Sequence, residues 1–158
     1  MPTHSANRDR GRATAFADER DATRRAAVQT LLATGKLQSG RDFHFAAMVF
    51  QHSEAAKDVR LAHLLAVTAV AKEHESARWL AAATFDRHLW HLNQPQVFGT
   101  QFKQTEKGDW TMDPYDREAV PDHLRADWCV ISLSEQTSVL AAMREGRSAG
   151  ATNIADCK

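Results

Sequence analysis

Two alanine-rich segments with helical periodicity occupy the middle of the chain. The first ends near residue 72, the second spans 75–92, and only a short polar link separates them. Apolar residues recur along both segments with the i, i+3, i+4 spacing of a helix face. Because alanine side chains are small, the two helix backbones can approach each other closely. The pattern therefore predicts an antiparallel helical hairpin as the centre of the fold.

The same spacing predicts further helices on both sides of this hairpin. They are expected at 15–35, 41–52, 116–127 and 133–144. In 41–52 the predicted buried face is Phe45, Met48, Val49 and His52. Gly35 is a natural stop for the first helix. We therefore predict a mainly α fold of antiparallel helical hairpins, with about five to six helices.

A change in sequence pattern after Pro95 predicts a small β-hairpin at about 96–113. Two segments that are expected to be strands, 97–105 and 110–112, flank a glycine-containing turn, Glu106-Lys107-Gly108-Asp109. We expect one helical domain over 13–147 that includes this hairpin. A disordered tail is expected at 1–12 and a loose tail at 148–158.

The bulk composition gives no electrostatic reason to expect a nucleic-acid or membrane partner. Among 158 residues, 20 Lys and Arg balance 20 Asp and Glu. The longest apolar run, 64–71, is far shorter than the roughly 20 residues that span a bilayer. The polar first dozen residues show no apolar segment of a secretory signal, so the expected location is cytoplasmic. The two cysteines lack the spacing of metal ligands, and we predict no metal or cofactor.

Polar residues concentrate at one place, where Asp86-Arg87 precedes the stretch 94–102. An acid, an arginine, three glutamines and a threonine fall there beside apolar residues. Buried polar side chains are costly unless each finds a partner, so this cluster is either a closed hydrogen-bond network or a site. The candidate residues, with His52 and Gln51 from an earlier helix, are Gln51, His52, Asp86, Arg87, Gln96, Gly99, Thr100 and Gln101.

The enzyme interpretation assigns a role to each of these residues. His52 paired with Asp86 would be a general base, held in one tautomer by the carboxylate. Arg87 would bind a carboxylate or phosphate group of the substrate. The substrate would also be positioned by neighbouring groups, which are Gln51, Gln96, Gly99, Thr100 and Gln101.

Three other interpretations remain open. Asp86 or Arg87 could instead bond to free backbone groups of the segment 94–101 and lock it onto the helices, without any catalytic role. Histidine pairs, His44 with His52 and His88 with His91, could lie on common helix faces, although neither has a typical zinc spacing. Aromatic residues near the cluster could form the wall of a ligand pocket; these are Trp79, Trp90 and Phe98.

The order of these motifs resembles a bacterial family known only as a domain of unknown function. Its pattern is a Gln-His pair, an Asp-Arg pair and Gln-x-Tyr-Gly-Thr-Gln, which Gln51-His52, Asp86-Arg87 and residues 96–101 match. Phe98 stands where the family often has Tyr, so no phenolic hydroxyl is available there. The resemblance covers about 15–133. It implies a mostly helical fold with a shared polar site, and it brings no known chemistry.

Two classes of function follow as hypotheses. The first is a small-molecule enzyme of the hydrolase or lyase type that uses the polar cluster. The second is a non-catalytic helical module that binds a peptide, a metabolite or a protein through the same residues.

Overall fold

The computed structural model describes residues 4–147, with side chains from Glu19 onward. The chain divides into two compact units, 1–38 and 39–158, where we expected one domain over 13–147. The first helix begins at His4 and therefore includes much of the segment that we expected to be a disordered tail. The predicted loose tail at 148–158 lies outside the described residues.

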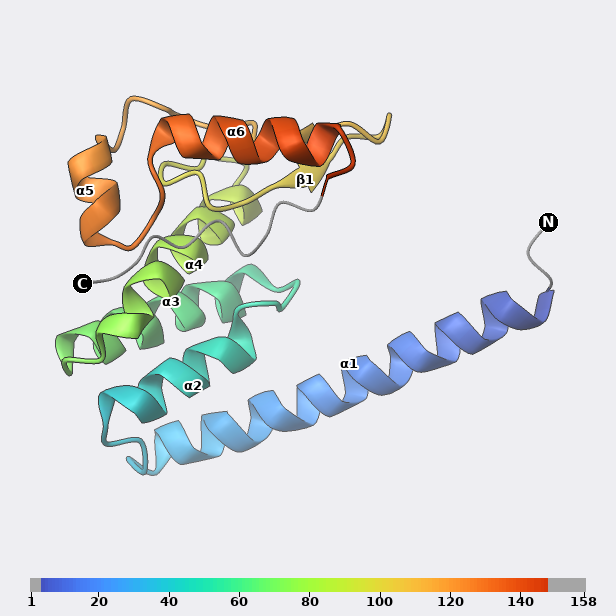
Figure 1. The fold of residues 1–158 in the computed structure, drawn as a ribbon. Helices are drawn as coiled ribbons and strands as arrows, with labels where there is room; N and C mark the ends of the chain where they lie inside the picture. The colour runs from blue at the N-terminus through green and yellow to red at the C-terminus, as the bar shows by residue number, and fades with distance from the viewer. Residues whose placement is uncertain (1–3, 148–158) are drawn as a thin grey trace. The chain divides into compact units, whose positions relative to one another are not determined.

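The first unit contains one long helix, α1 (His4–Ala33) (Figure 1). It ends in a Schellman motif, in which the Gly35 N–H donates to the Leu32 carbonyl at 3.1 Å and the Lys36 N–H donates to the Leu31 carbonyl at 2.9 Å. Gly35 has φ +64°, a left-handed conformation that glycine adopts without steric cost. The predicted stop at Gly35 is confirmed.

The second unit contains the remaining helices and one two-stranded hairpin (Figure 1). In chain order these are α2 (Gly40–Phe50), α3 (Ala56–Ala71), the 3₁₀ helix η1 (Glu75–Ala77), α4 (Arg78–His91), β1 (Lys103–Gln104), β2 (Trp110–Thr111), α5 (Asp122–Asp127) and α6 (Leu133–Arg144). The described residues thus form six α-helices and one small antiparallel hairpin. The predicted mainly α fold is confirmed.

Two helices of this unit begin with a capping box that is visible in the sequence. Ser39 accepts a hydrogen bond from the Asp42 N–H, and the Asp42 carboxylate accepts one from the Ser39 N–H. Ser132 and Glu135 repeat the arrangement at the start of α6. Each box pairs two backbone donors that a helix start would otherwise leave free.

Small residues form the contact faces of α2, α3 and α4. The buried alanines of these helices include Ala46, Ala47, Ala62, Ala66, Ala69, Ala81, Ala82 and Ala83. The predicted buried face of α2 was wrong, because Phe45 and Met48 are 55% and 45% exposed and His52 is exposed. The helices approach each other through faces rich in alanine, together with the buried Phe50, Leu65 and Leu80, while Phe45 and Met48 point outward.

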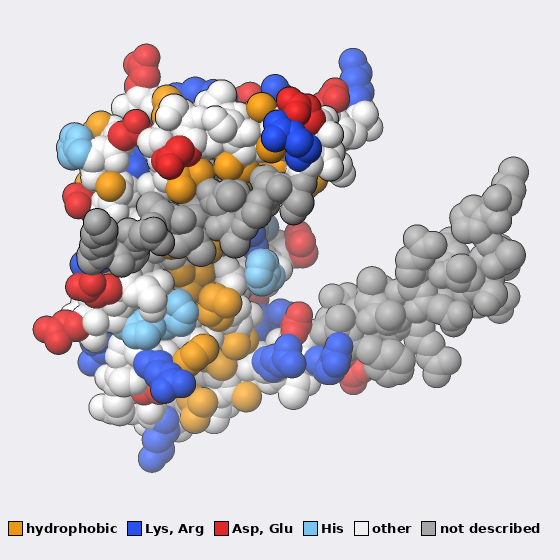
Figure 2. Space-filling model, viewed as in Figure 1, with side chains coloured by type: hydrophobic (Ala, Val, Ile, Leu, Met, Phe, Trp, Pro, Cys, Tyr) orange, Lys and Arg blue, Asp and Glu red, His pale blue; other side chains and the backbone are white. Residues whose placement is uncertain are grey.

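Exposed apolar side chains therefore lie on the outer faces of α2 and α3. They include Phe45, Met48, Leu64 and Val67. Figure 2 shows hydrophobic side chains gathered on this part of the second unit. No helix within residues 4–147 is long and apolar enough to cross a membrane.

The β-hairpin is shorter than predicted. Lys103 pairs with Thr111 and Gln104 with Trp110, and the turn between them contains Gly108 at φ +88°. The preceding segment, 96–102, forms a loop that lies against α4 instead of a strand, apart from a β-bridge between Gln96 and Tyr115. Side chains hold the rest of this loop, as described next.

Candidate functional site

Asp86 holds the loop after α4 through four hydrogen bonds. The side chain is 0% exposed. Its Oδ1 accepts from the backbone N–H groups of Val97 at 2.8 Å and Phe98 at 3.0 Å. Its Oδ2 accepts from the N–H of Thr100 at 2.9 Å and from the Thr100 hydroxyl at 2.7 Å. The carboxylate therefore pairs backbone donors that would otherwise be buried without a partner.

This arrangement decides between two of the sequence interpretations for Asp86. Burial raises the pKa of Asp86, while the four donated hydrogen bonds favour the ionised form and oppose that shift. The predicted pair with His52 is not formed, because both carboxylate oxygens are directed at the loop. The geometry is the backbone lock that the sequence left open as an alternative.

The Gln96 side chain links the loop to the β-hairpin by hydrogen bonds. Its side chain is 0% exposed, its Oε1 accepts from the Gln101 N–H at 2.9 Å, and its Nε2 donates to the Gln101 carbonyl at 2.9 Å. The same Nε2 also donates to the Met112 carbonyl. All of these partners are backbone groups, so Gln96 ties the loop to the hairpin and does not face a ligand.

A second buried cluster holds the middle of the loop from the opposite side. The Phe98 carbonyl accepts from Arg125 Nη1 at 2.5 Å and from Gln136 Nε2 at 2.6 Å. Gln136 in turn accepts from the Tyr115 hydroxyl at 2.8 Å. Gly99 has φ +75°, and a Cβ there would lie 2.5 Å from Gln136 Oε1. Glycine is therefore required at this position for both its conformation and its size.

Arg87 lies beside this network and links three segments of the chain. Its Nε and Nη2 donate to Gln101 Oε1 at 3.1 and 3.0 Å. Its Nη1 donates to the Gln51 carbonyl at 2.7 Å and to His52 Nδ1 at 2.9 Å. Since a guanidinium can only donate, His52 Nδ1 is an acceptor, and the neutral imidazole carries its proton on Nε2. The structure thus brings His52 to Arg87, not to Asp86.

Gln101 and Thr100 are occupied by protein partners. Gln101 Nε2 donates to the Ala83 carbonyl at 3.1 Å and to Thr100 Oγ1 at 3.0 Å, while its oxygen receives Arg87. Gln101 therefore orients Arg87. The Thr100 hydroxyl donates to Asp86, and Thr100 is 5% exposed, which is unfavourable for a nucleophile.

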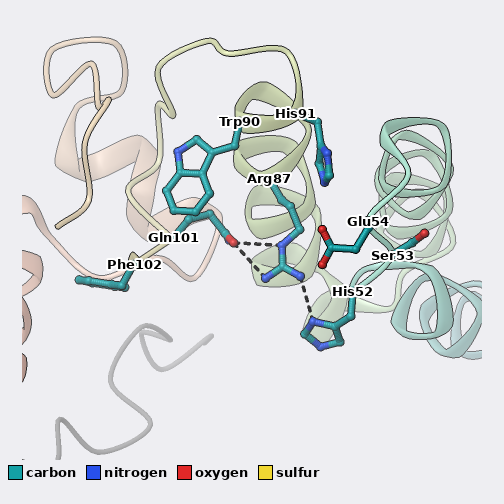
Figure 3. Close-up of a pocket in the computed structure, with 8 residues that line it drawn as sticks. All are labelled: His52, Ser53, Glu54, Arg87, Trp90, His91, Gln101 and Phe102. Atoms are coloured by element: carbon teal, nitrogen blue, oxygen red, sulfur yellow. Dashed lines mark hydrogen bonds between the residues drawn. The ribbon is translucent and has the colours of Figure 1, made fainter. Parts of the chain in front are cut away.

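An open pocket of about 330 Å³ lies beside Arg87 (Figure 3). Its lining residues are His52, Ser53, Glu54, Arg87, Trp90, His91, Gln101 and Phe102. An adjoining cleft of about 310 Å³ shares part of this lining and adds Trp79 and Trp110. We call the first of these the Arg87 pocket. Its volume is within the range of pockets that hold small molecules.

The Arg87 guanidinium is half-buried and has no ion-pair partner among the described residues. No carboxylate oxygen of that part of the chain lies within 4.0 Å of its nitrogens, and its hydrogen-bond partners are all neutral. Burial lowers the pKa of Arg87, whereas the charge of Glu54 raises it. Figure 3 shows the Glu54 carboxylate pointing toward the guanidinium across the pocket. A positive charge in this setting attracts an anion.

The structure sorts the predicted site residues into two groups. His52, Arg87 and Gln101 line the Arg87 pocket, and the adjoining cleft also includes Gln51 and Thr100. The remaining candidates, which line neither space, are Asp86, Gln96 and Gly99. These three belong to the loop network instead.

Sequence reasoning missed Glu54 in the pocket and Arg125 and Gln136 in the loop network. Glu54 lies two residues after His52, in the connection between α2 and α3, and connections carry functional residues more often than helix interiors do. That position was the available signal. Arg125 and Gln136 lie in ordinary amphipathic patterns, and nothing in the sequence marks them as buried.

The histidine pairs considered for metal binding do not assemble a ligand set. His44 lies against His74, with ring centroids 4.9 Å apart, and His91 faces the Arg87 pocket. Among residues 19–147, whose side chains the structure describes, no three His, Cys, Asp or Glu side chains come together as potential metal ligands.

Comparison of the chain with protein-family models, with curated protein sequences and with solved structures gives no match. The resemblance to a bacterial family of unknown function therefore stays a prediction.

Proposed function

We propose that the protein binds a small metabolite with a carboxylate or phosphate group in the Arg87 pocket. The observation that carries this proposal is the half-buried Arg87 guanidinium, whose partners are neutral and which borders an open pocket. Gln101 fixes the guanidinium through two hydrogen bonds, so little side-chain entropy is lost when an anion binds. Trp90 and Phe102 supply apolar walls for the rest of the ligand.

Glu54 sets the strength of anion binding in this proposal. Its carboxylate shares the pocket with Arg87 and repels a bound anion. Replacing Glu54 with Gln removes one negative charge at an exposed position and leaves the side-chain size unchanged. One charge in such a partly exposed setting is worth about 1 kcal/mol, which corresponds to an affinity gain of roughly fivefold.

The experiment is a calorimetric titration of the protein with succinate and with inorganic phosphate at low salt. The unmodified protein should bind at least one of them, Glu54→Gln should bind it more tightly, and added salt should weaken both. The matched control is Glu106→Gln, an exposed change in the hairpin turn, which should leave binding unchanged. Absence of binding to both anions, or equal affinity in the two variants, would contradict the proposal.

Hydrolase or lyase chemistry at the same pocket is the second candidate. The observation that favours it is the presence of Glu54, His52 and His91 beside an arginine in one open pocket. Because His52 Nδ1 accepts from Arg87, protonating that nitrogen would break the bond, so Glu54 is the better base. Turnover of a p-nitrophenyl ester or phosphate that disappears in Glu54→Gln would support this candidate.

The proposal keeps the predicted cytoplasmic location, which cell fractionation would test.

A further inference from the structure

A second cavity lies in the same unit and shares no lining residue with the Arg87 pocket. Its volume is about 200 Å³, and α3, α4, the loop after α4 and the end of α5 contribute to it. Three aromatic rings, Phe85, Phe98 and Trp128, form one wall. The Phe85 and Phe98 rings meet edge to face, as do those of Phe98 and Trp128. We call this space the His63 cavity after its fourth ring.

His63 presents a hydrogen-bond acceptor in this apolar setting. Its Nδ1 lies 3.0 Å from the Ala81 carbonyl, which can only accept, so Nδ1 carries a proton. Burial lowers the pKa of His63, which favours the neutral ring with an unprotonated Nε2. Nε2 makes no hydrogen bond to the described residues, and they do not enclose it completely. It is therefore accessible to an incoming donor.

The size and lining of the cavity limit what can bind. An engineered apolar cavity of about 150 Å³ in another protein binds benzene, so about 200 Å³ accommodates one aromatic ring with a small substituent. The surrounding rings favour an aromatic ligand through edge-to-face contacts. No lining residue is an acid, a lysine or an arginine, so a charged ligand would lose its water without gaining a partner.

We propose that the His63 cavity binds a small neutral aromatic molecule of the phenol class, whose single hydroxyl donates to His63 Nε2. The ring lies against the wall that Phe85, Phe98 and Trp128 form. This binding is independent of the function proposed for the Arg87 pocket, because the two spaces have no residue in common.

The experiment compares phenol with toluene, which has the same ring and no hydroxyl. Affinities are measured by titration in ¹H–¹⁵N NMR spectra of the full chain, for the unmodified protein and for His63→Phe. The variant keeps an aromatic ring and removes the acceptor. The ratio of phenol affinity to toluene affinity should fall about fivefold in the variant, as expected for one net hydrogen bond. An unchanged ratio would overturn the proposed role of Nε2.

A second variant tests the cavity itself without altering His63. Val67 lines the cavity and is 38% exposed, so Val67→Trp should fill its mouth without disturbing the core. Binding of both ligands should be lost. The matched control is Leu92→Trp, another exposed apolar position that does not line the cavity, and it should bind both ligands normally. The proposal is overturned if neither phenol nor toluene binds, if Val67→Trp still binds both, or if tetramethylammonium binds in their place.

Discussion

Replacing Asp86 with Asn tests the role of the loop network most sharply. Asn has nearly the same shape, carries no charge and keeps only one acceptor oxygen. The four hydrogen bonds that Asp86 accepts come from Val97, Phe98 and Thr100, and the carboxylate is 0% exposed. The substitution therefore changes the hydrogen bonding of the loop without creating a cavity.

The expected loss of stability follows from these bonds one by one. If the remaining oxygen keeps the Val97 and Phe98 N–H groups, each of those two bonds becomes neutral and loses about 1 kcal/mol. The Asn nitrogen then opposes the Thr100 N–H, and a buried unpaired donor costs about 1–3 kcal/mol. Relief from burying a charge offsets part of this sum. We expect a net loss of about 3 kcal/mol in the free energy of unfolding.

The assay is urea unfolding at pH 7, followed by circular dichroism and tryptophan fluorescence. The control is Asp127→Asn, an exposed aspartate at the end of α5, which should stay within about 0.5 kcal/mol of the unmodified protein. If Asp86→Asn were as stable as this control, the four bonds would not hold the loop, and the architectural role that we assign to Asp86 would be refuted.

Two further predictions concern the loop and the half-buried His63. Gly99→Ala should lower the free energy of unfolding by more than about 2 kcal/mol, because the new Cβ would clash with Gln136 and Tyr115. The control is Gly108→Ala, at a similar positive φ with no atom within 4 Å of the new Cβ, which should cost only about 1 kcal/mol. Equal shifts in melting temperature for the two variants would contradict the clash. Burial lowers the pKa of His63 below its usual 6.5, so the unfolded chain binds a proton at this residue more readily than the folded protein does. The stability that the folded protein gains from a neutral His63 is therefore complete above pH 6.5 and is lost as the pH falls below that value. His63→Gln should flatten that part of the pH profile in urea unfolding, and a profile identical to that of the unmodified protein would contradict the assignment.

Local signals explain what could be predicted from the sequence. The last helix was expected at 133–144 from its apolar spacing and is observed at Leu133–Arg144, and the capping-box residue Ser132 directly precedes it. Gly35 ended the first helix for an equally local reason, since a left-handed residue is needed there. Such features depend on neighbouring residues only.

The errors arise where distant residues decide the outcome. The buried face of α2 was wrong because alanines of three helices pack together, and periodicity alone favoured the larger Phe45 and Met48. Residues 97–102 were expected to form a strand, but Asp86 on α4 accepts hydrogen bonds from three of their backbone N–H groups in place of a neighbouring strand. Glu54 has only a weak sequence signal, its position in the connection after α2, since an exposed acid after a helix is common. It gains its significance only from its position opposite Arg87.

The central claim is that Arg87, unlike the buried arginine Arg125, faces a ligand. It is tested most directly by the ¹H–¹⁵N resonances of the arginine side chains during a titration with succinate. The account predicts that the Arg87 Nε resonance shifts in a saturable manner, while that of Arg125, which is 0% exposed and bonded to the Phe98 carbonyl, stays in place. A titration in which the Arg87 resonance does not move, or moves only in parallel with the exposed arginines, would contradict it.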